Sequence, residues 1–415
     1  MAGYRPLIII AALLVLIFSY FIIERLIVDR RLRRLKLRIA VSGTRGKSSV
    51  TRLIAGALRE SGLRVLAKTT GSAAMTILPD GSEREIARPG PASILENKAL
   101  LGLARRHRAE ALVCEMMSIS PECLWIETHR LLKPQTLLIT NVRLDHRDEQ
   151  GRTREEIARS LAAAIRPGCT VFVPEPDHFS IFDEQAQAVK ARIIRVPDAS
   201  GSPVERDSPL GRAEFEENIR LALAATDSLG IPRPVALRGM SKAKPDRGRL
   251  EVVKASLGVP AATWMLVSAF AANEPESTRR TLDKLRGLFP FSGAALRGVL
   301  NLREDRGERT LQWLDALKDG FFREFDTVAL VGSAAVPALR RKVKAYRDQP
   351  GVPARLLILS DGSPERITAV VSSAPTPGAM SGRGLIIGLG DMGGLGLRLK
   401  EYWERIGERT EKGVD

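Results

Sequence analysis

The residues best suited to chemistry lie between Leu37 and Leu58, in LRIAVSGTRGKSSVTRLIAGAL. Apolar residues typical of a buried strand come first, and a glycine-rich turn and Lys47-Ser48 follow. Apolar residues then recur at the spacing of a helix with one buried face. Strand, glycine loop, Lys-Ser and helix together are typical of a P-loop, although Val41 occupies the place of the usual first glycine. The alternative is an ordinary glycine-rich turn at the start of a helix.

A P-loop binds phosphate with backbone N–H groups and with the partial positive charge of the helix N-terminus. We therefore predict that Lys47 contacts the terminal phosphates of ATP and that Ser48 binds Mg²⁺. The predicted nucleotide-binding residues of this loop are Gly43, Thr44, Arg45, Gly46, Lys47, Ser48 and Ser49.

Further polar residues follow other predicted strands. Lys68–Ser72 follows Val65–Ala67, Glu115 follows Ala111–Cys114, and Asn141–His146 follows the strand that ends at Thr140. Ligands of parallel sheets bind beyond the carboxyl ends of the strands, so we expect these groups to converge on the P-loop. Oxygen and imidazole groups suit a metal–phosphate site, and we predict Ser48, Glu115 and His146 as its metal ligands. Taken singly, Glu115 is equally typical of a solvated charge and His146 of a surface histidine.

The amino-acid composition indicates which classes of binding partner to expect. The formal charge of +16 indicates polyanions, meaning nucleic acid, anionic lipid or an acidic substrate, unless the whole proteome is rich in arginine. Aromatic residues make up 5% of the chain and do not alternate with basic ones, which argues against nucleic acid. The cysteines, Cys114, Cys123 and Cys169, form no metal-type pair and suit a reducing compartment.

An apolar segment precedes the P-loop. Leu7–Ile23 is almost wholly apolar and Leu26–Val28 extends it, which predicts one transmembrane helix within residues 1–28. A cleaved signal peptide is the alternative, but no small-x-small cleavage site follows. Seven basic residues lie between Arg25 and Arg38, against Arg5 alone before the segment. By the positive-inside rule, a single-pass protein of the cell membrane with cytoplasmic catalytic domains is expected.

The remaining pattern is α/β. Strands alternate with helices, which predicts a doubly wound, mostly parallel sheet domain over residues 37–245. A basic juxtamembrane linker is predicted at 29–36, and a smaller C-terminal α/β domain at 246–415 after a hinge within 233–246. Gly388–Gly393 matches a dinucleotide-binding glycine pattern. Too few residues follow for the required βαβ unit, so a flexible turn or a close backbone approach to substrate or a domain cleft is expected there.

The motifs resemble a known superfamily. GTRGKSS, CEMMS with Glu115, and the segment from Thr140-Asn141 to Asp145-His146 are similar to the ATP domain of Mur ligases and folylpolyglutamate synthases. Residues 215–225 resemble that family's adenine-contacting helix, which implies that Asn218 contacts the adenine; Glu217 replaces a His found in many members. Gly248–Glu251 and Asp305–Arg309 resemble segments of the family's C-terminal domain. The resemblance implies that Arg249 and Arg306 contact phosphate or substrate carboxylates, and Arg306 is therefore a predicted catalytic residue beside Lys47, Glu115 and His146.

A narrower resemblance covers nearly the whole chain. The apolar segment, the basic stretch, RPGP, AFAANEPEST, NLREDRGER and the terminal GLGDMGGLGL, in this order with the motifs above, resemble the ligase-subunit family of poly-γ-glutamate synthases (PgsB/CapB type). This implies an ATP- and Mg²⁺-dependent ligase that polymerises glutamate into poly-γ-glutamate through an acyl phosphate. Its implied partners are glutamate, the growing chain, the membrane and small integral-membrane synthase subunits, with no nucleic acid.

Departures from the superfamily limit these implications. The lysine that many members carbamylate to hold a second metal is missing near Ser160-Leu161, so a second metal held that way is not expected. Ala269–Glu274 replaces an Asp-x-Ala-His segment, and no nucleotide-sugar domain precedes the P-loop. Two alternatives stay open: another ligase of the Mur or folylpolyglutamate type, and a membrane-bound P-loop ATPase that is not a ligase.

Overall fold

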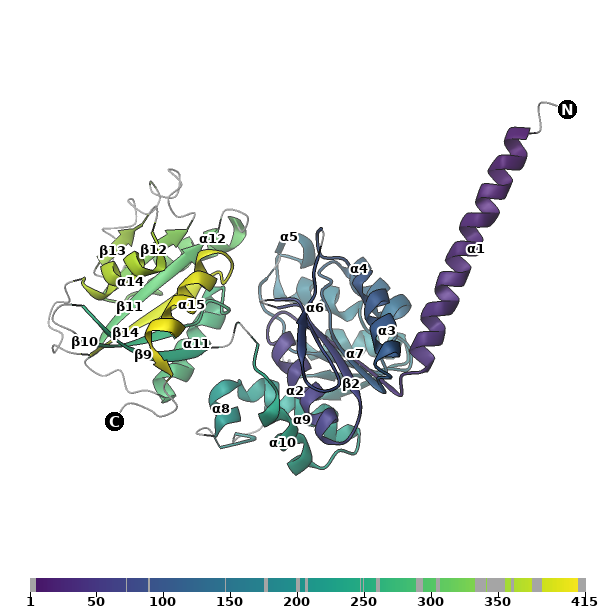
Figure 1. Ribbon diagram of the computed structural model, residues 1–415, viewed down its shortest axis with the longest axis horizontal. Coiled ribbons are helices and arrows are strands. Elements are labelled where there is room, and N and C mark those ends of the chain that lie inside the picture. Colours follow the sequence, from purple (N-terminus) through teal and green to yellow (C-terminus); the bar gives the residue numbers. More distant parts are fainter. Residues whose placement is uncertain are drawn as a thin grey trace. The chain divides into compact units, whose positions relative to one another are not determined.

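The computed structural model describes residues 5–71, 73–88, 90–145, 147–174, 178–198, 202–205, 208–246, 248, 250–258, 262–288, 294–303, 307–332, 341, 355–359, 362–374 and 383–409. The chain divides into two compact units, residues 1–246 and 247–415, each built on its own sheet (Figure 1). The predicted α/β fold, a mostly parallel sheet domain followed by a second α/β domain, is confirmed.

The first unit contains an eight-stranded sheet in the order β4-β3-β2-β5-β1-β6-β7-β8. The strands from β2 to β8 in this order are parallel, while β3 and β4 form an antiparallel edge. The strands are β1 (Leu37–Ser42), β2 (Val65–Thr69), β3 (Met75–Ile77), β4 (Glu83–Glu85), β5 (Ala111–Glu115), β6 (Thr136–Ile139), β7 (Thr170–Val173) and β8 (Arg192–Arg195). The helices are α1 (Arg5–Arg33), α2 (Lys47–Glu60), α3 (Glu96–Arg106), α4 (Pro121–Ile126), the π-helix η2 (Glu127–Leu132), α5 (Arg147–Gln150), α6 (Arg154–Ala162), α7 (Phe179–Ala188), α8 (Pro209–Ala213), α9 (Glu216–Ser228) and α10 (Arg233–Lys242).

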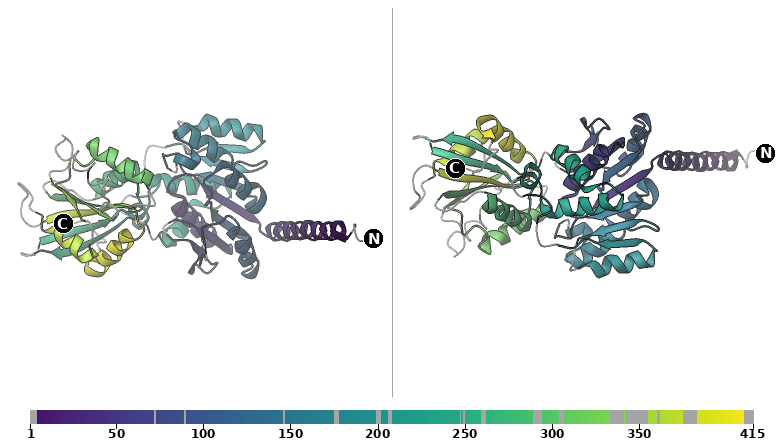
Figure 2. Two further views of the ribbon diagram at one scale, coloured as in Figure 1. Left: turned by 90° about the horizontal axis from the view of Figure 1, so that it is seen from above. Right: turned by 90° about the horizontal axis from the view of Figure 1, so that it is seen from below.

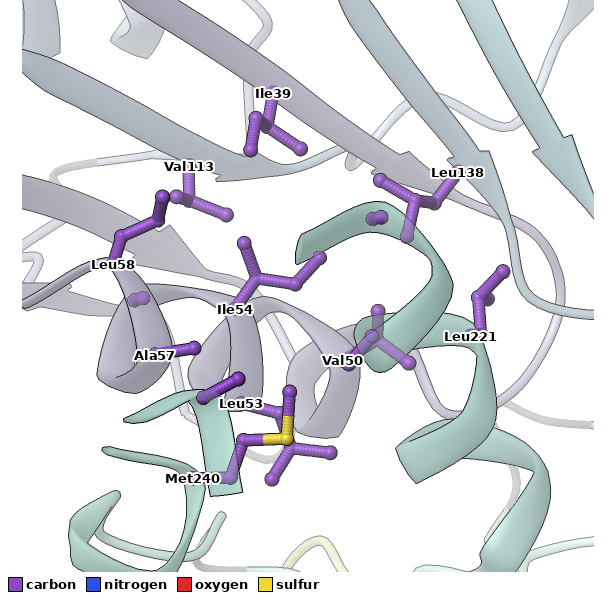
Figure 3. Close-up of a cluster of buried hydrophobic side chains, with 14 of the residues drawn as sticks. Ile39, Val50, Leu53, Ile54, Ala57, Leu58, Val113, Leu138, Leu221 and Met240 are labelled. Atoms are coloured by element: carbon purple, nitrogen blue, oxygen red, sulfur yellow. The ribbon is translucent and has the colours of Figure 1, made fainter. Parts of the chain in front are cut away.

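Successive strand residues point to opposite faces of this sheet and pack into different apolar clusters there. Ile39 of β1 and Val113 of β5 pack against Val50, Ile54 and Leu58 of α2 (Figure 3). On the other face, residues of opposite parity pack with α3 and the end of α1, or with α6 and α7. The helix that follows the P-loop is therefore buried between the sheet and helices α9 and α10.

Helix α10 shortens the segment that can act as a hinge. We expected a hinge within residues 233–246; Arg233–Lys242 is helical and packs on α2, while the division between the two units falls after Asp246. Pro234 lies in its first turn, where the missing N–H of a proline costs nothing. Gly56 of α2 and Gly239 of α10 allow the two backbones to touch, because a Cβ on Gly239 would lie 2.4 Å from the Gly56 carbonyl oxygen.

Helix α1 has an apolar part and a packed end. Its large apolar side chains from Leu7 to Ile27 are 44–68% exposed, and Figure 2 shows this part running free of the sheet. The helix is long and apolar enough to cross a membrane. Residues 29–36, predicted as a linker, continue the helix to Arg33, and Val28, Leu32 and Leu35 are buried against α3 and η2. Burial of this apolar stripe makes the segment part of the first unit.

The second unit contains a seven-stranded sheet in the order β13-β12-β11-β14-β10-β9-β15. Strands β9 and β15 are antiparallel to their neighbours, and the rest are parallel. The strands are β9 (Glu251–Leu257), β10 (Ala262–Ser268), β11 (Ala295–Leu302), β12 (Thr327–Gly332), β13 (Arg355–Ile358), β14 (Arg383–Gly390) and β15 (Glu408–Arg409). Helices α11 (Pro275–Leu288) and α12 (Gly307–Lys318) pack on one face, and α14 (Pro364–Ser372) and α15 (Leu395–Ile406) on the other.

Candidate active site

The phosphate loop connects the end of β1 to the start of α2. Gly43 and Gly46 both have positive φ, 116° and 81°. Gly46 is the N-cap of α2 in the left-handed region, and a Cβ there would lie 2.5 Å from Oδ1 of Asn218. Glycine is therefore required at position 46 both by backbone conformation and by the neighbouring side chain.

Lys47 begins α2 and folds back over the loop. Its Nζ donates to the carbonyl oxygens of Gly43 at 2.7 Å and Thr44 at 3.3 Å. Loss of water around the ammonium lowers the pKa of Lys47, although the carboxylates of Glu115 and Asp145 oppose this shift. The lysine charge is thus held at the loop, where it can face an anion.

Ser48 and Glu115 form the acidic side of the site. The Ser48 hydroxyl donates to Oε2 of Glu115 at 2.7 Å, and the backbone N–H of Thr70 donates to the same oxygen at 2.6 Å. Glu115 is 2% exposed at the carboxyl end of β5. The ends of β1, β2 and β5 therefore meet at one buried carboxylate.

Asn141 fixes the loop from the other side. Its Oδ1 accepts from Thr44 Oγ1 at 2.7 Å and from the backbone N–H of Arg45 at 3.0 Å, and its Nδ2 donates to the carbonyl of Arg45 at 3.1 Å. Sequence reasoning placed Asn141 near the loop and gave it no role. The signal for this clamp was its position directly after a strand that neighbours β1.

Two ion pairs surround the loop. Arg45 lies 3.2 Å from Asp145, and Arg143 lies 2.7 Å from Glu217 of α9. Neither pair was predicted. Glu217, which stands where many superfamily members have a histidine, accepts a hydrogen bond from the Arg143 guanidinium.

Asn218 lies at the loop as well. It is 4% exposed on α9, and its side-chain amide faces Gly46. Ser49 lies in the first turn of α2. A contact between Asn218 and adenine stays a prediction, but the residue is at the phosphate loop.

The side chains present fit a divalent cation bound with a nucleotide. The Ser48 hydroxyl and the Glu115 carboxylate are hard oxygen ligands at the helix N-terminus that would receive phosphate. Two buried hydroxyls at this edge, of Thr69 and Thr140, have no hydrogen-bond partner among the residues that the structure describes. These orphaned groups suit a ligand with several oxygens.

Several predicted residues lie outside the described part of the chain. These are His146, Arg249 and Arg306. Within the described ranges, no three Asp, Glu, His or Cys side chains cluster as potential metal ligands. The structure thus unites Ser48 with Glu115, and His146 stays a predicted third ligand.

Both units of the chain match known protein families. The model of the Mur ligase middle domain matches residues 41–231, and that of the poly-gamma-glutamate synthase CapB C-terminal domain matches residues 256–406. The PGA synthase CapB of Bacillus subtilis (strain 168) is 30% identical over 345 residues, which cover 82% of this chain and 84% of that protein. The chain belongs to the CapB family. Its members share the Mur ligase and folylpolyglutamate synthase fold of ATP-dependent amide ligases, so the predicted family and enzyme class are confirmed.

A second relative supports the assignment to the CapB family, and a solved structure supports the fold. The capsule biosynthesis protein CapB of Bacillus anthracis is 34% identical over 303 residues, which cover 72% of this chain and 64% of that protein. A bifunctional folylpolyglutamate synthase/dihydrofolate synthase, solved with Mn, AMPPNP and L-glutamate bound, has a TM-score of 0.65. It is 18% identical, and the match covers 91% of this chain and 92% of the other. At that identity the match supports the fold alone.

Proposed function

We propose that this chain uses MgATP to join glutamate units through γ-amide bonds, producing poly-γ-glutamate. The observation that carries the proposal is the group formed by Lys47, Ser48 and Glu115 at the phosphate loop of a CapB-family chain. A bound metal–nucleotide complex requires a positive charge for its phosphates and oxygen ligands for its metal, and this helix N-terminus brings together an ammonium, a hydroxyl and a carboxylate.

The proposed reaction has two steps. A γ-carboxylate oxygen of glutamate attacks the γ-phosphorus of ATP, and ADP leaves. The α-amine of the next glutamate then attacks the acyl carbon, its proton is lost to solvent, and phosphate leaves with the carboxylate oxygen. The protein contributes positioning and charge neutralisation more than covalent chemistry.

Each residue has a defined task in this proposal. Lys47 neutralises the β- and γ-phosphates, while Ser48 and Glu115 hold Mg²⁺, with His146 as the predicted further ligand. Asn141 and Asn218 keep the loop in shape through the contacts described above, and Asn218 is also assigned to the adenine. Arg249 and Arg306 are assigned to phosphate or substrate carboxylates. Bound Mg²⁺ would draw charge from the phosphates during transfer.

The proposal includes a place in the cell. Helix α1 spans the cell membrane once, and the basic residues after its apolar part keep the two units in the cytoplasm. Small integral-membrane synthase subunits are the proposed partners, and nucleic acid is not one.

An isotope experiment tests the chemistry. Glutamate labelled with ¹⁸O in its γ-carboxylate should transfer one ¹⁸O atom into the released phosphate, in proportion to the amide bonds formed. Unlabelled phosphate alongside polymer would rule out the acyl phosphate.

A substrate comparison separates the alternatives. ATP hydrolysis that needs no amine acceptor would favour a P-loop ATPase that is not a ligase. Preference for a folate-type acceptor over oligoglutamate would favour another ligase of the superfamily. The proposal requires ADP release that depends on glutamate and polymer that grows with it.

A further inference from the structure

A pocket of about 730 Å³ lies on the α3 face of the first sheet. Its wall includes Lys68 of β2, which shares strand parity with Leu66 of the cluster around α3, while Ala67 faces the cluster around α2. The pocket is therefore on the opposite face of the sheet from the P-loop helix. The active site does not use it.

Cations dominate the polar lining. Arg31 of α1, Lys68, and Arg105 and Arg106 of α3 contribute positive charge, and Glu96 contributes one carboxylate. Glu96 is occupied, because Arg88 binds both its oxygens at 2.7 and 3.1 Å and Lys68 lies at 3.3 Å. Arg31, Arg105 and Arg106 form no ion pair with any described residue. The pocket thus carries uncompensated positive charge.

The side chain of Arg31 lines the pocket and is held against helix α3. Its Nη1 donates to the carbonyl oxygen of Lys98 at 3.3 Å, and its buried Nε has no partner among the described residues. Gly102 of α3 leaves room for it, because a Cβ there would lie 3.3 Å from Nη1. A glycine inside a helix costs about 1 kcal/mol relative to alanine. Here that glycine lets the guanidinium lie close against α3.

The position of Arg31 along α1 determines the level of the pocket relative to the membrane surface. Arg31 comes four residues after Ile27, where the exposed apolar run ends, which is about 6 Å along a helix. The headgroup layer on each side of a bilayer is roughly 5–8 Å thick. If α1 spans the membrane as proposed above, Arg31 lies at the level of the lipid phosphates.

Apolar residues lie beside the cations. Ile86, Leu100 and Leu103 line the same pocket. A phospholipid presents an anionic phosphate next to apolar glycerol ester and acyl groups, so its two parts match this mixed lining. A polyglutamate chain would place carboxylates against the apolar side. We propose that this pocket binds the headgroup of an anionic phospholipid from the cytoplasmic leaflet.

Binding of a soluble short-chain lipid tests the pocket without a membrane. The full-length chain in zwitterionic detergent is titrated with dihexanoyl-phosphatidylglycerol, and dihexanoyl-phosphatidylcholine serves as the neutral-headgroup control. The variant R31Q/R106Q should weaken phosphatidylglycerol binding at least tenfold. The matched variant R33Q/R34Q removes two exposed charges of the same basic segment outside the pocket, and it should change binding less than twofold. Equal weakening by both pairs would show general attraction to the basic segment and overturn the pocket.

A second variant guards against a folding defect in the first. G102A keeps every charge and favours the helix, but it crowds Arg31, so binding should weaken about threefold with thermal stability unchanged or raised. Unaltered binding in G102A would remove Arg31 from the site.

Competition identifies the source of the anion. Inorganic phosphate should displace the lipid only at concentrations at least a hundredfold higher. Equal competition by phosphate would indicate a free-anion site, and stronger competition by poly-γ-glutamate would indicate a product site; either result overturns the lipid proposal. These measurements contain no ATP or glutamate, so a failure of the proposed ligase reaction would leave their outcome unaffected. Flotation of the full chain with vesicles tests anchoring separately.

Discussion

The two units each contain a central parallel strand followed by a glycine-rich turn and a helix. In the first, β1 leads through Gly43–Gly46 into α2; in the second, β14 leads through Gly390–Gly394 into α15. Gly46 and Gly390 even share nearly the same φ, 81° and 83°. The two turns nevertheless have different surroundings, and that difference decides which one can accept a phosphate.

Two glycines of the turn in the second unit are closely packed against that unit. A Cβ on Gly390 would meet the carbonyl oxygen of Asn301, and one on Gly393 would meet the guanidinium of Arg303. Asn301 Nδ2 donates to the carbonyl of Asp391 at 2.6 Å. These glycines permit close packing within the second unit. A flexible turn, or an approach of this segment to a substrate or a domain cleft, stays a prediction.

The two turns also differ in the charged groups around them. In the second, the turn itself contains a carboxylate, Asp391, paired with Arg309 at 2.8 Å. In the first, the helix begins with Lys47 and Ser48, and the carboxylates of Glu115 and Asp145 come from other elements. An anion at the first turn would face the ammonium of Lys47, whereas at the second turn Arg309 is already paired with the carboxylate of Asp391. Similar backbone geometry is therefore insufficient for a phosphate site.

Removal of the lysine should give the largest effect. K47A should reduce glutamate-dependent ADP release by about a thousandfold or more, because the phosphates lose their charge partner. Thermal unfolding should stay close to that of the wild type. Near-normal turnover in a folded K47A protein would refute the assignment of the first turn.

The equivalent glycines offer a direct comparison. G46A and G390A should each destabilise their own unit by about 2–4 kcal/mol, because both require left-handed backbone and both would collide with a neighbour. Calorimetry would report the unfolding of each unit. G46A should also weaken ATP binding at least tenfold, whereas G390A should leave it within twofold; equal losses of ATP affinity would contradict the contrast between the turns.

The metal side of the first turn can be tested by titration. E115Q keeps the size of the side chain and removes the charge, so the Mg²⁺ concentration for half-maximal activity should rise about tenfold. Mn²⁺ should show the same displacement. An unchanged titration with both metals would remove Glu115 from the cation site.

The smallest effect is expected at the acidic residue of the second turn. D391N should lower the stability of the second unit by about 1–3 kcal/mol, because the partly buried guanidinium of Arg309 loses the charge of the Asp391 carboxylate. ATP affinity, measured by equilibrium binding, should not change. A gain in ATP affinity would mean that the second turn also takes part in nucleotide binding.

Local patterns predicted elements better than boundaries. The sequence predicts a helix over residues 92–106, but in the structure this helix begins at Glu96, whose backbone N–H donates to the carbonyl of Ser93 in a preceding turn. The sequence also predicts a helix over residues 153–165, and in the structure this helix begins after its N-cap Thr153 and ends at Ala162. The segment 233–246 is rich in Pro, Lys and Arg, which favours a hinge, yet Pro234 also suits the first turn of a helix. Such choices depend on neighbours that a local pattern does not contain.

The sequence by itself determined the phosphate loop, the strand-and-helix alternation of both sheets and the long apolar helix, because each is encoded in neighbouring residues. Tertiary structure decided which groups meet at the loop. Ser48 and Glu115 are 67 residues apart and Thr44 and Asn141 are 97 apart, and strand order alone brings them together. It also decided that Gly390 and Gly393 of the second unit are closely packed by neighbouring groups and that the basic segment after the apolar helix packs on α3. Side chains distant in sequence occupy or leave the space around a turn, and only their packing determines whether a ligand can enter.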